Sequence, residues 1–485
     1  MSPNTLAWAA LYGWPLVVLA VYATRRGRAR LARTTAWMLI LPVMFLPSLV
    51  NLPFAALDKN RIAVLSIAVA LELFHRHELL ARARWRRFPL FVLFVIGFGA
   101  FQTVRTNRDP LNYGLLTLPG LGARDGIWML YGFFVDAYLP FVVGQRVFKT
   151  ERDLRDLLTV LSKCALIYAP LCVIEMRLSP QFSNWVYGYF PHAFEQTMRG
   201  SGYRPVVFMN HGLSVAMFLF SGFCASIALH KACVTGRPPP KQSAIIVGVL
   251  LLAGRSLASI IYSLVTLLLL VWPSSKTTAR VVLVVAIVVT GYPALRAYGI
   301  IPIHGISEFF AGISSERSSS LMFRFDQEEA LLAHAMERPL FGWGGWSRNR
   351  IFVTWGDPVE SVRDVSVTDG TWIIVLGVSG IIGFFSSFAL MILPLLRYMY
   401  YRARVPRPSQ ALLAALALIV AFFTLDLLPN ANSDFLQLAY SGALFTLSHR
   451  LSRRRAARMH ACSGPIPSSI ADKRAPTLGD PLENT

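Results

Sequence analysis

A series of thirteen apolar segments, most of them long enough to cross a lipid bilayer, constrains the fold of this chain more than any other feature. Only 15% of its 485 residues are charged, whereas soluble domains carry about 25%. Backbone groups in lipid must be hydrogen-bonded within their own segment, which favours helices. We therefore expect an all-α polytopic membrane protein with spans at about residues 6–24, 36–56, 62–76, 88–104, 126–145, 157–175, 205–229, 243–253, 257–272, 280–298, 371–396, 411–428 and 435–448.

The segments 243–253 and 257–272 are short, and Arg255 lies between them. They form either one long tilted helix or two helices broken at Gly254, which gives 12 or 13 spans. An arginine facing lipid would cost about 2.5–3.5 kcal/mol even on a lenient insertion scale. A break at Gly254 would bring Arg255, as a functional residue, to the outer interface or into a polar cavity. The alternative is an arginine paired with a buried acid that fixes helix packing.

The distribution of basic residues predicts the orientation of the chain. Alternate connections carry 28 Lys and Arg residues, and the opposite set carries 16 spread over much more chain. The side richer in Lys and Arg is cytoplasmic, so the N-terminus and residues 299–369 face outward and the C-terminus faces the cytoplasm. The net charge of +21 then reflects topology, and we expect no nucleic-acid partner.

The pattern divides the chain into transmembrane helices over 1–298, a large external loop over 299–369, further transmembrane helices over 370–448, and a basic tail over 449–485. The tail is predicted to be disordered, because it ends in residues without hydrophobic periodicity. The five cysteines lie in apolar spans or cytoplasmic segments, which indicates neither a disulfide framework nor a thiolate metal site. The absence of metal-ligand spacings and of a phosphate-binding glycine loop leads us to expect no metal and no cofactor.

The loop 299–369 is the long polar stretch of the chain and the best clue to function. Residues 321–338 have the periodicity of an amphipathic helix that Pro339 ends. This helix either contributes polar residues to a site or lies on the membrane surface. Its apolar face is predicted to hold Leu321, Phe325, Leu332 and Met336, and its polar face Arg324, Gln327, His334 and Arg338.

Two tryptophans follow in the sequence Gly342-Trp-Gly-Gly-Trp346, with Arg348 and Arg350 close behind. We interpret Trp343 and Trp346 as aromatic rings on a flexible glycine frame. Flat aromatic faces suit the apolar faces of sugar rings. Anchoring of the tryptophans at the membrane interface is the competing interpretation.

A second external segment, residues 176–204, ends with Arg199 and Arg204 on either side of a glycine-rich turn. Backbone N–H groups and guanidinium forks in such a turn can hold phosphate oxygens. The alternative is that both arginines anchor the next span at the interface. His211 lies at the mouth of that span. We favour a packing or hydrogen-bonded role for it over a catalytic one.

Two aspartates complete the set of candidate residues. Asp369 lies where the large loop re-enters the membrane, and there it could accept a proton from an external hydroxyl or cap the next helix. Asp136 lies in the middle of the fifth span, where a charge is costly unless it is paired. Arg255 and Arg204 are its expected partners.

Residues 324–345, together with residues 368–383, resemble the shared region of the bacterial O-antigen ligase and O-antigen polymerase superfamily. There an arginine opens a helix, a Pro-Leu-x-Gly-x-Gly turn follows, and a span begins with a Gly-Ile/Leu-Ile-Gly signature. Gly254-Arg255-Ser256 is similar to a Ser-Arg-Gly-type segment of that family. Arg204 with Met209-Asn-His-Gly212 matches its arginine before an Asn-containing helix start. The resemblance covers roughly residues 195–390.

The resemblance implies a GT-C-like, metal-independent glycosyltransferase of the bacterial inner membrane. Its donor would be a glycan on undecaprenyl diphosphate, and its large loop would be periplasmic. Arg204, Arg255 and Arg324 would hold the diphosphate or position the donor. Asp369 stands where the family has a histidine that is implicated in activating the acceptor hydroxyl. This departure favours a polymerase over a lipopolysaccharide ligase.

We therefore predict polymerisation of lipid-linked repeat units in exopolysaccharide or O-antigen biosynthesis. Asp369, Arg255 and Arg324 are the predicted catalytic residues. The predicted partners are the lipid-linked glycan, membrane lipids and a chain-length regulator or other assembly protein. The alternatives are transfer of glycan to a lipid acceptor, as in the O-antigen ligases, and transport of the lipid-linked glycan. The predicted substrate-binding residues are Arg199, Arg204, His211, Trp343, Trp346, Arg348 and Arg350.

Overall fold

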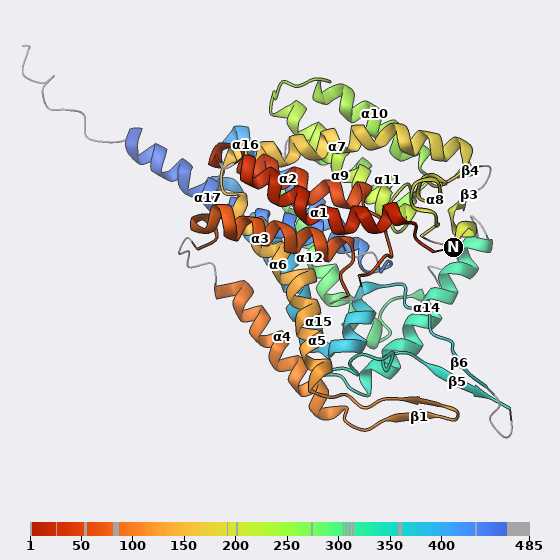
Figure 1. The fold of residues 1–485 in the computed structure, drawn as a ribbon. Helices are drawn as coiled ribbons and strands as arrows, with labels where there is room; N and C mark the ends of the chain where they lie inside the picture. The colour runs from red at the N-terminus through yellow and green to blue at the C-terminus, as the bar shows by residue number, and fades with distance from the viewer. Residues whose placement is uncertain are drawn as a thin grey trace, which may run out of the picture.

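The computed structural model is a bundle of helices with three short β-hairpins at one end (Figure 1). It describes the chain except for residues 1, 26, 53–55, 81–86, 192, 200–201, 273–274, 304, 306–307, 309–311, 313–314, 357–360, 432–433 and 463–485. The first half of the bundle contains α1 (Thr5–Thr24), α2 (Arg28–Phe45), α3 (Lys59–Leu80), α4 (Arg87–Thr106), α5 (Ala123–Phe133), the π-helix η2 (Phe134–Tyr138), α6 (Leu139–Val147), α7 (Glu151–Leu178), α8 (Phe182–Tyr187), the 3-10 helix η3 (Phe194–Thr197) and α9 (Gly212–Lys231).

The second half of the chain continues the bundle. Its helices are α10 (Pro240–Ala253), α11 (Leu257–Val271), α12 (Ser275–Ala297), α14 (Ser315–Met336), α15 (Thr371–Tyr401), the 3-10 helix η4 (Arg402–Arg404), α16 (Arg407–Asp426) and α17 (Phe435–Cys462). The antiparallel hairpins pair β1 (Leu111–Tyr113) with β2 (Leu116–Leu118), β3 (Met198–Arg199) with β4 (Gly202–Tyr203), and β5 (Phe352–Trp355) with β6 (Ser361–Asp364).

The predicted all-α polytopic membrane protein is confirmed at this level. Every predicted apolar segment except 36–56 falls largely within helices, and 126–145 runs through α5, η2 and α6. Eight described stretches are long and apolar enough to cross a membrane; they are α1, α4, α5 to α6, α7, α9, α12, α15 to η4, and α16. The helices α2, α3 and α17 are long but more polar, and α10 and α11 are shorter. The chain is therefore a multi-pass membrane protein.

Three predicted boundaries are wrong. The second helix ends at Phe45 rather than near residue 56, because Leu46 precedes Pro47 and takes an extended conformation, as residues before proline do. Helix α9 begins at Gly212, after a segment that starts with Pro205, rather than at residue 205. Helix α17 continues to Cys462, so the first part of the predicted disordered tail is helical; residues 463–485 lie outside the described part.

Helices α10 and α11 are two separate helices that form a hairpin against α9. Gly254 ends α10, and Arg255 takes a left-handed conformation with a φ of 52°. At one end, Lys231 of α9 donates to the carbonyl oxygen of Leu270 in α11. At the other end, Arg204, just before α9, donates to the carbonyl oxygen of Arg255. Of the two alternatives, the structure has two helices broken at Gly254, and Arg255 lies at the helix turn rather than inside a span.

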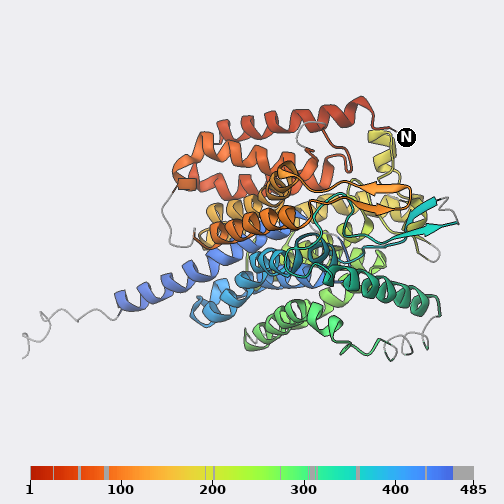
Figure 2. The ribbon, with the colours of Figure 1, turned by 90° about the horizontal axis from the view of Figure 1, so that it is seen from below.

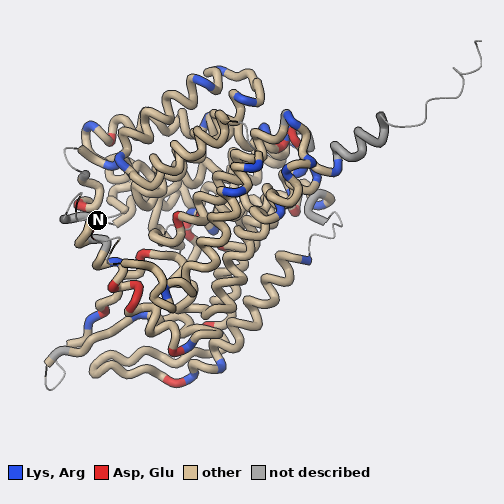
Figure 3. The backbone as a smooth tube through the Cα atoms, turned by 180° about the vertical axis from the view of Figure 1, so that it is seen from behind, with Lys and Arg blue, Asp and Glu red and all other residues tan. Residues whose placement is uncertain are grey.

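The two ends of the bundle differ in what they carry. Figures 1 and 2 both show the N-terminus, α14 and the three hairpins toward one end, which we call the loop end. The C-terminal part of α17 leaves at the opposite end, which we call the tail end. Figure 3 shows Lys and Arg residues gathered around the tail end.

A break in α15 joins the large loop to the bundle. Gly380 has φ 65° and ψ −170°, which interrupts the helix. An unbroken helix would join the N–H groups of Ile381 and Ile382 to the carbonyl oxygens four residues earlier. Those N–H groups instead donate to Pro339 and Leu340, and the carbonyl oxygens of Gly377 and Val378 accept from Trp343 and Gly344. Two helical hydrogen bonds are thus replaced by four bonds to the loop.

Candidate functional site

Two of the three predicted catalytic residues contact each other at the loop end. Arg324, on α14, lies with its Nε 3.1 Å from Oδ2 of Asp369, and the two side chains are 45% and 38% exposed. The side chain of Gln327, also on α14, accepts a hydrogen bond from the backbone N–H of Val367 and so holds this end of the loop against the helix. The alternative role of Asp369 as a helix cap is wrong, because Gly370 is the N-cap of α15 and no side chain caps it.

A buried carboxylate that sequence reasoning missed lies one helical turn from Arg324. Glu328 accepts hydrogen bonds from Tyr292 and Trp372 and lies 3.4 Å from Nε of Arg296. Burial raises the pKa of the Glu328 carboxyl, while its hydrogen bonds and Arg296 act in the opposite sense. This cluster fixes α14 against α12 and α15, and it therefore positions Arg324.

The buried face of α14 differs from the predicted one. It holds Glu328, Leu331, Leu332 and Ala335, whereas Met336 is 43% exposed. The side chain of Leu321 lies outside the described residues. The predicted polar face contacts the protein rather than water alone, since Gln327 and His334 bind later parts of the same loop. The buried face differs from the predicted one because α14 packs on α15 through Glu328. Arg296 balances the charge of this buried carboxylate.

Arg204 and Arg255 also come together, as the sequence suggested for residues near a phosphate. Arg204 is buried, with its Nη2 3.4 Å from the carbonyl oxygen of Arg255. A Cβ atom on Gly202 would lie 3.5 Å from the guanidinium carbon of Arg255, so the hairpin of β3 and β4 packs beside that group. The side chain of Arg255 is itself exposed. The side chain of Arg199 lies outside the described residues.

A buried glutamate holds the segment that follows Arg204. The Glu175 carboxylate, in the last turn of α7, accepts hydrogen bonds from the N–H groups of Phe182, Val206 and Val207. Three donors on one carboxylate immobilise the loop between the hairpin and α9. His211 caps α9, because its Nδ1 accepts a hydrogen bond from the N–H of Leu213. His211 is thus the hydrogen-bonded residue that we expected.

The two tryptophans of the loop have different surroundings. Trp343 is only 6% exposed, stacks on His334 with ring centroids 4.6 Å apart, and lies under the guanidinium of Arg338. Its ring cannot offer an open face to a sugar, so its predicted binding role is wrong. Trp346 is 59% exposed, and its indole N–H donates to Asp125.

The glycines around these tryptophans are fixed rather than flexible. A Cβ on Gly342 would lie 2.6 Å from the backbone of Val378, and one on Gly344 would lie 2.3 Å from Leu121. Both glycines also have a positive φ, of 70° and 79°. Gly342 therefore permits close contact with α15, and Gly344 permits close contact with Leu121. These two glycines do not form the flexible frame that we predicted.

Arg348 is buried, and Arg350 is paired within the loop. Arg348 is 1% exposed and donates to the carbonyl oxygens of Asp109 and Pro119, and burial lowers its pKa. Arg350 forms an ion pair of 2.6 Å with Asp364 of β6. These bonds tie Arg348 to the segments beside the β1–β2 hairpin and Arg350 to β6, and burial leaves Arg348 closed to a substrate.

Asp136 is paired, but not with a predicted partner. Arg61, near the start of α3, binds it through two hydrogen bonds of 2.8 and 2.7 Å. The prediction of Arg255 or Arg204 is wrong because the hairpin turn at Arg255 contacts the segment before α9 rather than η2. Among the described residues, no group of three or more His, Cys, Asp or Glu side chains is arranged to hold a metal ion.

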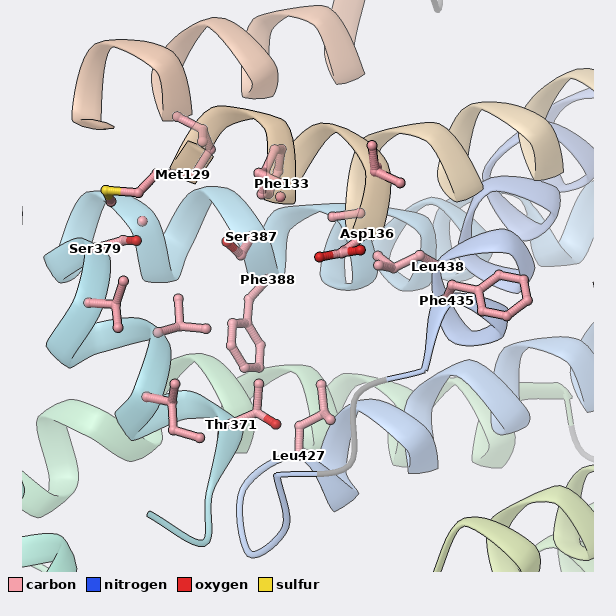
Figure 4. A pocket seen from close by; sticks show the side chains of 18 of the residues that line it. Met129, Phe133, Asp136, Thr371, Ser379, Ser387, Phe388, Leu427, Phe435 and Leu438 are labelled. Carbon is pink, nitrogen blue, oxygen red and sulfur yellow. The ribbon is translucent and has the colours of Figure 1, made fainter. Parts of the chain in front are cut away.

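A groove of about 520 Å³ runs beside the break in α15 (Figure 4). Figure 4 shows Asp136, Phe388, Thr371 and Leu427 around one space. Its α15 wall extends from Thr371 to Met391 and includes residues on both sides of the break at Gly380. Most of the wall is apolar, with carboxylates from Asp58, Asp136 and Asp434. Thr371 follows Asp369 by two residues, so the groove and the Arg324–Asp369 pair share the N-terminus of α15.

Comparisons with known proteins leave the chain without an assigned family. No protein-family model matches it, and no curated protein matches it.

Proposed function

We propose that this protein is a glycosyltransferase that polymerises undecaprenyl-diphosphate-linked oligosaccharide repeat units in exopolysaccharide or O-antigen biosynthesis. The reaction would take place at the periplasmic face of the bacterial inner membrane, at the loop end. The observation that carries the proposal is the half-exposed Arg324–Asp369 pair just before α15. Helix α15, from Thr371 onward, lines an apolar groove. A surface ion pair such as Arg324–Asp369 contributes little stability, so its placement supports a chemical role.

The residues of the loop end suit a transfer that needs one base and several cations. The acceptor hydroxyl oxygen would attack the anomeric carbon of the donor, and its proton would pass to the Asp369 carboxylate. The bond between that carbon and the diphosphate oxygen would break. The diphosphate would leave with the bonding electrons, and Arg324 would stabilise its charge. Arg255, exposed at its helix turn and contacted by Arg204, would hold the diphosphate or the donor glycan.

The groove along α15 suits the lipid part of such a donor. An isoprenoid chain is long and apolar, and the mostly apolar wall between Thr371 and Met391 suits such a chain. Asp136 adds a charge to this wall, but Arg61 neutralises it through two hydrogen bonds. Of the two tryptophans, Trp346 has the open ring for stacking on a sugar.

The test is chain growth by purified protein in liposomes that contain lipid-linked repeat units. We expect a ladder of longer glycans from the native protein and at least about a 100-fold slower reaction from Arg324→Ala, since one lost electrostatic donor costs that much in other enzymes. Arg350→Ala is the matched control, because it breaks an ion pair of similar exposure in the same loop. Normal chain growth by a folded Arg324→Ala protein would refute the assignment.

Transport of the same lipid-linked glycan is the second candidate. The carboxylates of Asp58, Asp136 and Asp434 in the groove favour transport. A transported polar group needs polar contacts along its path. In the same liposomes, a transporter would move the glycan across the bilayer without lengthening it. Transfer of the glycan to a second lipid would instead identify a ligase.

A further inference from the structure

Two neighbouring cavities open at the tail end, far along the bundle from Asp369. The first, of about 530 Å³, lies between α9, α11, α12, α15 and α16. The second, of about 450 Å³, lies between α12 and α15. Both are lined by Arg402, so they meet at one guanidinium.

The charged residues that line these cavities are all basic. Lys231, Arg402 and Arg407 face the first, and Lys276, Arg280 and Arg402 face the second. Neither described lining includes an Asp or a Glu. The bias of cytoplasmic loops toward Lys and Arg accounts for basic residues at this end, but not for their gathering around cavities without a balancing carboxylate.

The backbone around the cavities adds to the positive potential and holds Arg402 in place. Arg402 donates from Nε to the carbonyl oxygen of Ser275 and from Nη1 to that of Met399. These two bonds use two of the five N–H donors of the Arg402 guanidinium. Ser275 and Thr278 of the first cavity belong to the first turn of α12. The N–H groups of a first turn lack partners within the helix and attract anions.

The walls of the second cavity are apolar below its basic rim. Leu283, Leu396 and Met399 line it, and Leu283 and Leu396 are 36% and 40% exposed on the outer side of α12 and α15. A ligand that fits must combine an anionic group with an apolar part that can lie along these helices. Phospholipids with a phosphate headgroup and a net negative charge have this chemistry, and basic pockets between membrane helices bind such headgroups.

We propose that the two cavities form a binding site for an anionic phospholipid. The headgroup phosphate lies between Arg402, Lys276 and Arg280, and an acyl chain runs along Leu283 and Leu396. The site is separate from the Arg324–Asp369 pair at the loop end, and the proposal does not depend on the glycosyltransferase activity.

The test measures phosphatidylglycerol binding to the purified full-length protein by native mass spectrometry from micelles, with phosphatidylcholine as the neutral comparison. We expect preferential retention of phosphatidylglycerol. The double variant Lys276→Gln/Arg280→Gln should weaken it at least about tenfold, because each basic residue near an anionic lipid contributes substantially. Neither residue carries an ion pair among the described contacts, so the melting temperature should stay unchanged.

The matched control is Arg237→Gln/Lys241→Gln, which removes the same charge from exposed tail-end residues outside both cavities. Equal loss of phosphatidylglycerol in the control would show general attraction to the surface and overturn the proposal. Full displacement of the lipid by inorganic phosphate at equal concentration would assign the site to a soluble anion and overturn it as well. Equal retention of the two lipids by the native protein would also exclude it.

Discussion

The two halves of the large loop use the same residue types for different purposes. Arg324, in the first half, pairs with Asp369, the last residue of the loop, and both side chains are partly exposed. In the second half, Trp343 and Arg348 are 6% and 1% exposed and bind other parts of the protein. The comparison teaches that burial, rather than residue type, separates Trp343 and Arg348 from the candidate pair.

The difference arises from the break in α15. Residues 339–344 supply hydrogen bonds that the interrupted helix lacks, and this fixes the segment that carries Trp343. Arg324 and Asp369 lie outside that docked segment. Helix α14 and the hydrogen bond from the backbone N–H of Val367 to Gln327 hold them in place.

The largest expected effect concerns the exposed Arg324–Asp369 pair. Asp369→Asn should slow chain growth at least about 100-fold, because the amide cannot accept the proton. The swapped variant Arg324→Asp/Asp369→Arg restores an ion pair but exchanges the base and the cation. Polymer synthesis in liposomes should stay lost in the swapped variant. Recovery there would show that the pair only holds the loop to α14.

The second prediction concerns the docked half. Gly380→Ala should destabilise the protein by roughly 3 kcal/mol or more, because its backbone region is essentially restricted to glycine and a Cβ would lie 2.4 Å from the backbone of Leu340. The free energy of unfolding by denaturant in detergent measures the effect. Gly345→Ala is the control, since no atom lies within 4 Å of its Cβ position. Equal stability of the two variants would contradict the docking.

A somewhat smaller loss is expected for Arg348→Met. The change leaves the carbonyl oxygens of Asp109 and Pro119 without their donor, which should cost about 2–3 kcal/mol of unfolding free energy. Arg363→Met, at an exposed position of β6, should cost almost nothing. If instead Arg348→Met keeps its stability and loses polymerase activity, the residue belongs to the substrate site after all.

The smallest effect is a pH dependence at Asp364. Burial raises the pKa of its carboxyl, but hydrogen bonds from Ser366 and Arg350 outweigh this, so the pKa is lowered overall. Its contribution to stability is present above the ordinary Asp pKa and is lost as the pH falls through the lowered value. Asp364→Asn should therefore cost no more than about 1 kcal/mol at pH 7 and nothing near pH 2. A cost that is the same at both pH values would rule out this ion pair as its source.

The helices of the bundle could be predicted from the sequence because length and apolarity suffice for a membrane helix. The break beside Arg255 was also predictable, since an arginine in lipid is costly. The helix ends were harder, because they depend on local conformations such as the extended Leu46 before Pro47. Even so, every predicted apolar segment except 36–56 is mostly helical.

The pairing of the charged residues was not predictable in the same way. Arg324 and Asp369 were both candidates, but a contact across 45 positions leaves no local pattern. Asp136 was expected beside Arg255 and instead binds Arg61, near the start of another helix. The glycines beside Trp343 led to a wrong prediction for a related reason. A glycine that permits close contact and one that permits flexibility look the same in a sequence.

The interrupted α15 has a consequence for the biogenesis of the protein. Within hydrocarbon, each unsatisfied backbone group costs several kcal/mol, and the turn around Gly380 obtains its hydrogen bonds from residues 339–344. Those residues are synthesised before Gly380, and the turn obtains these hydrogen bonds when they dock on it. Insertion of this helix and folding of the loop are therefore one coupled event, and a defect in the loop should appear first as a defect in membrane insertion.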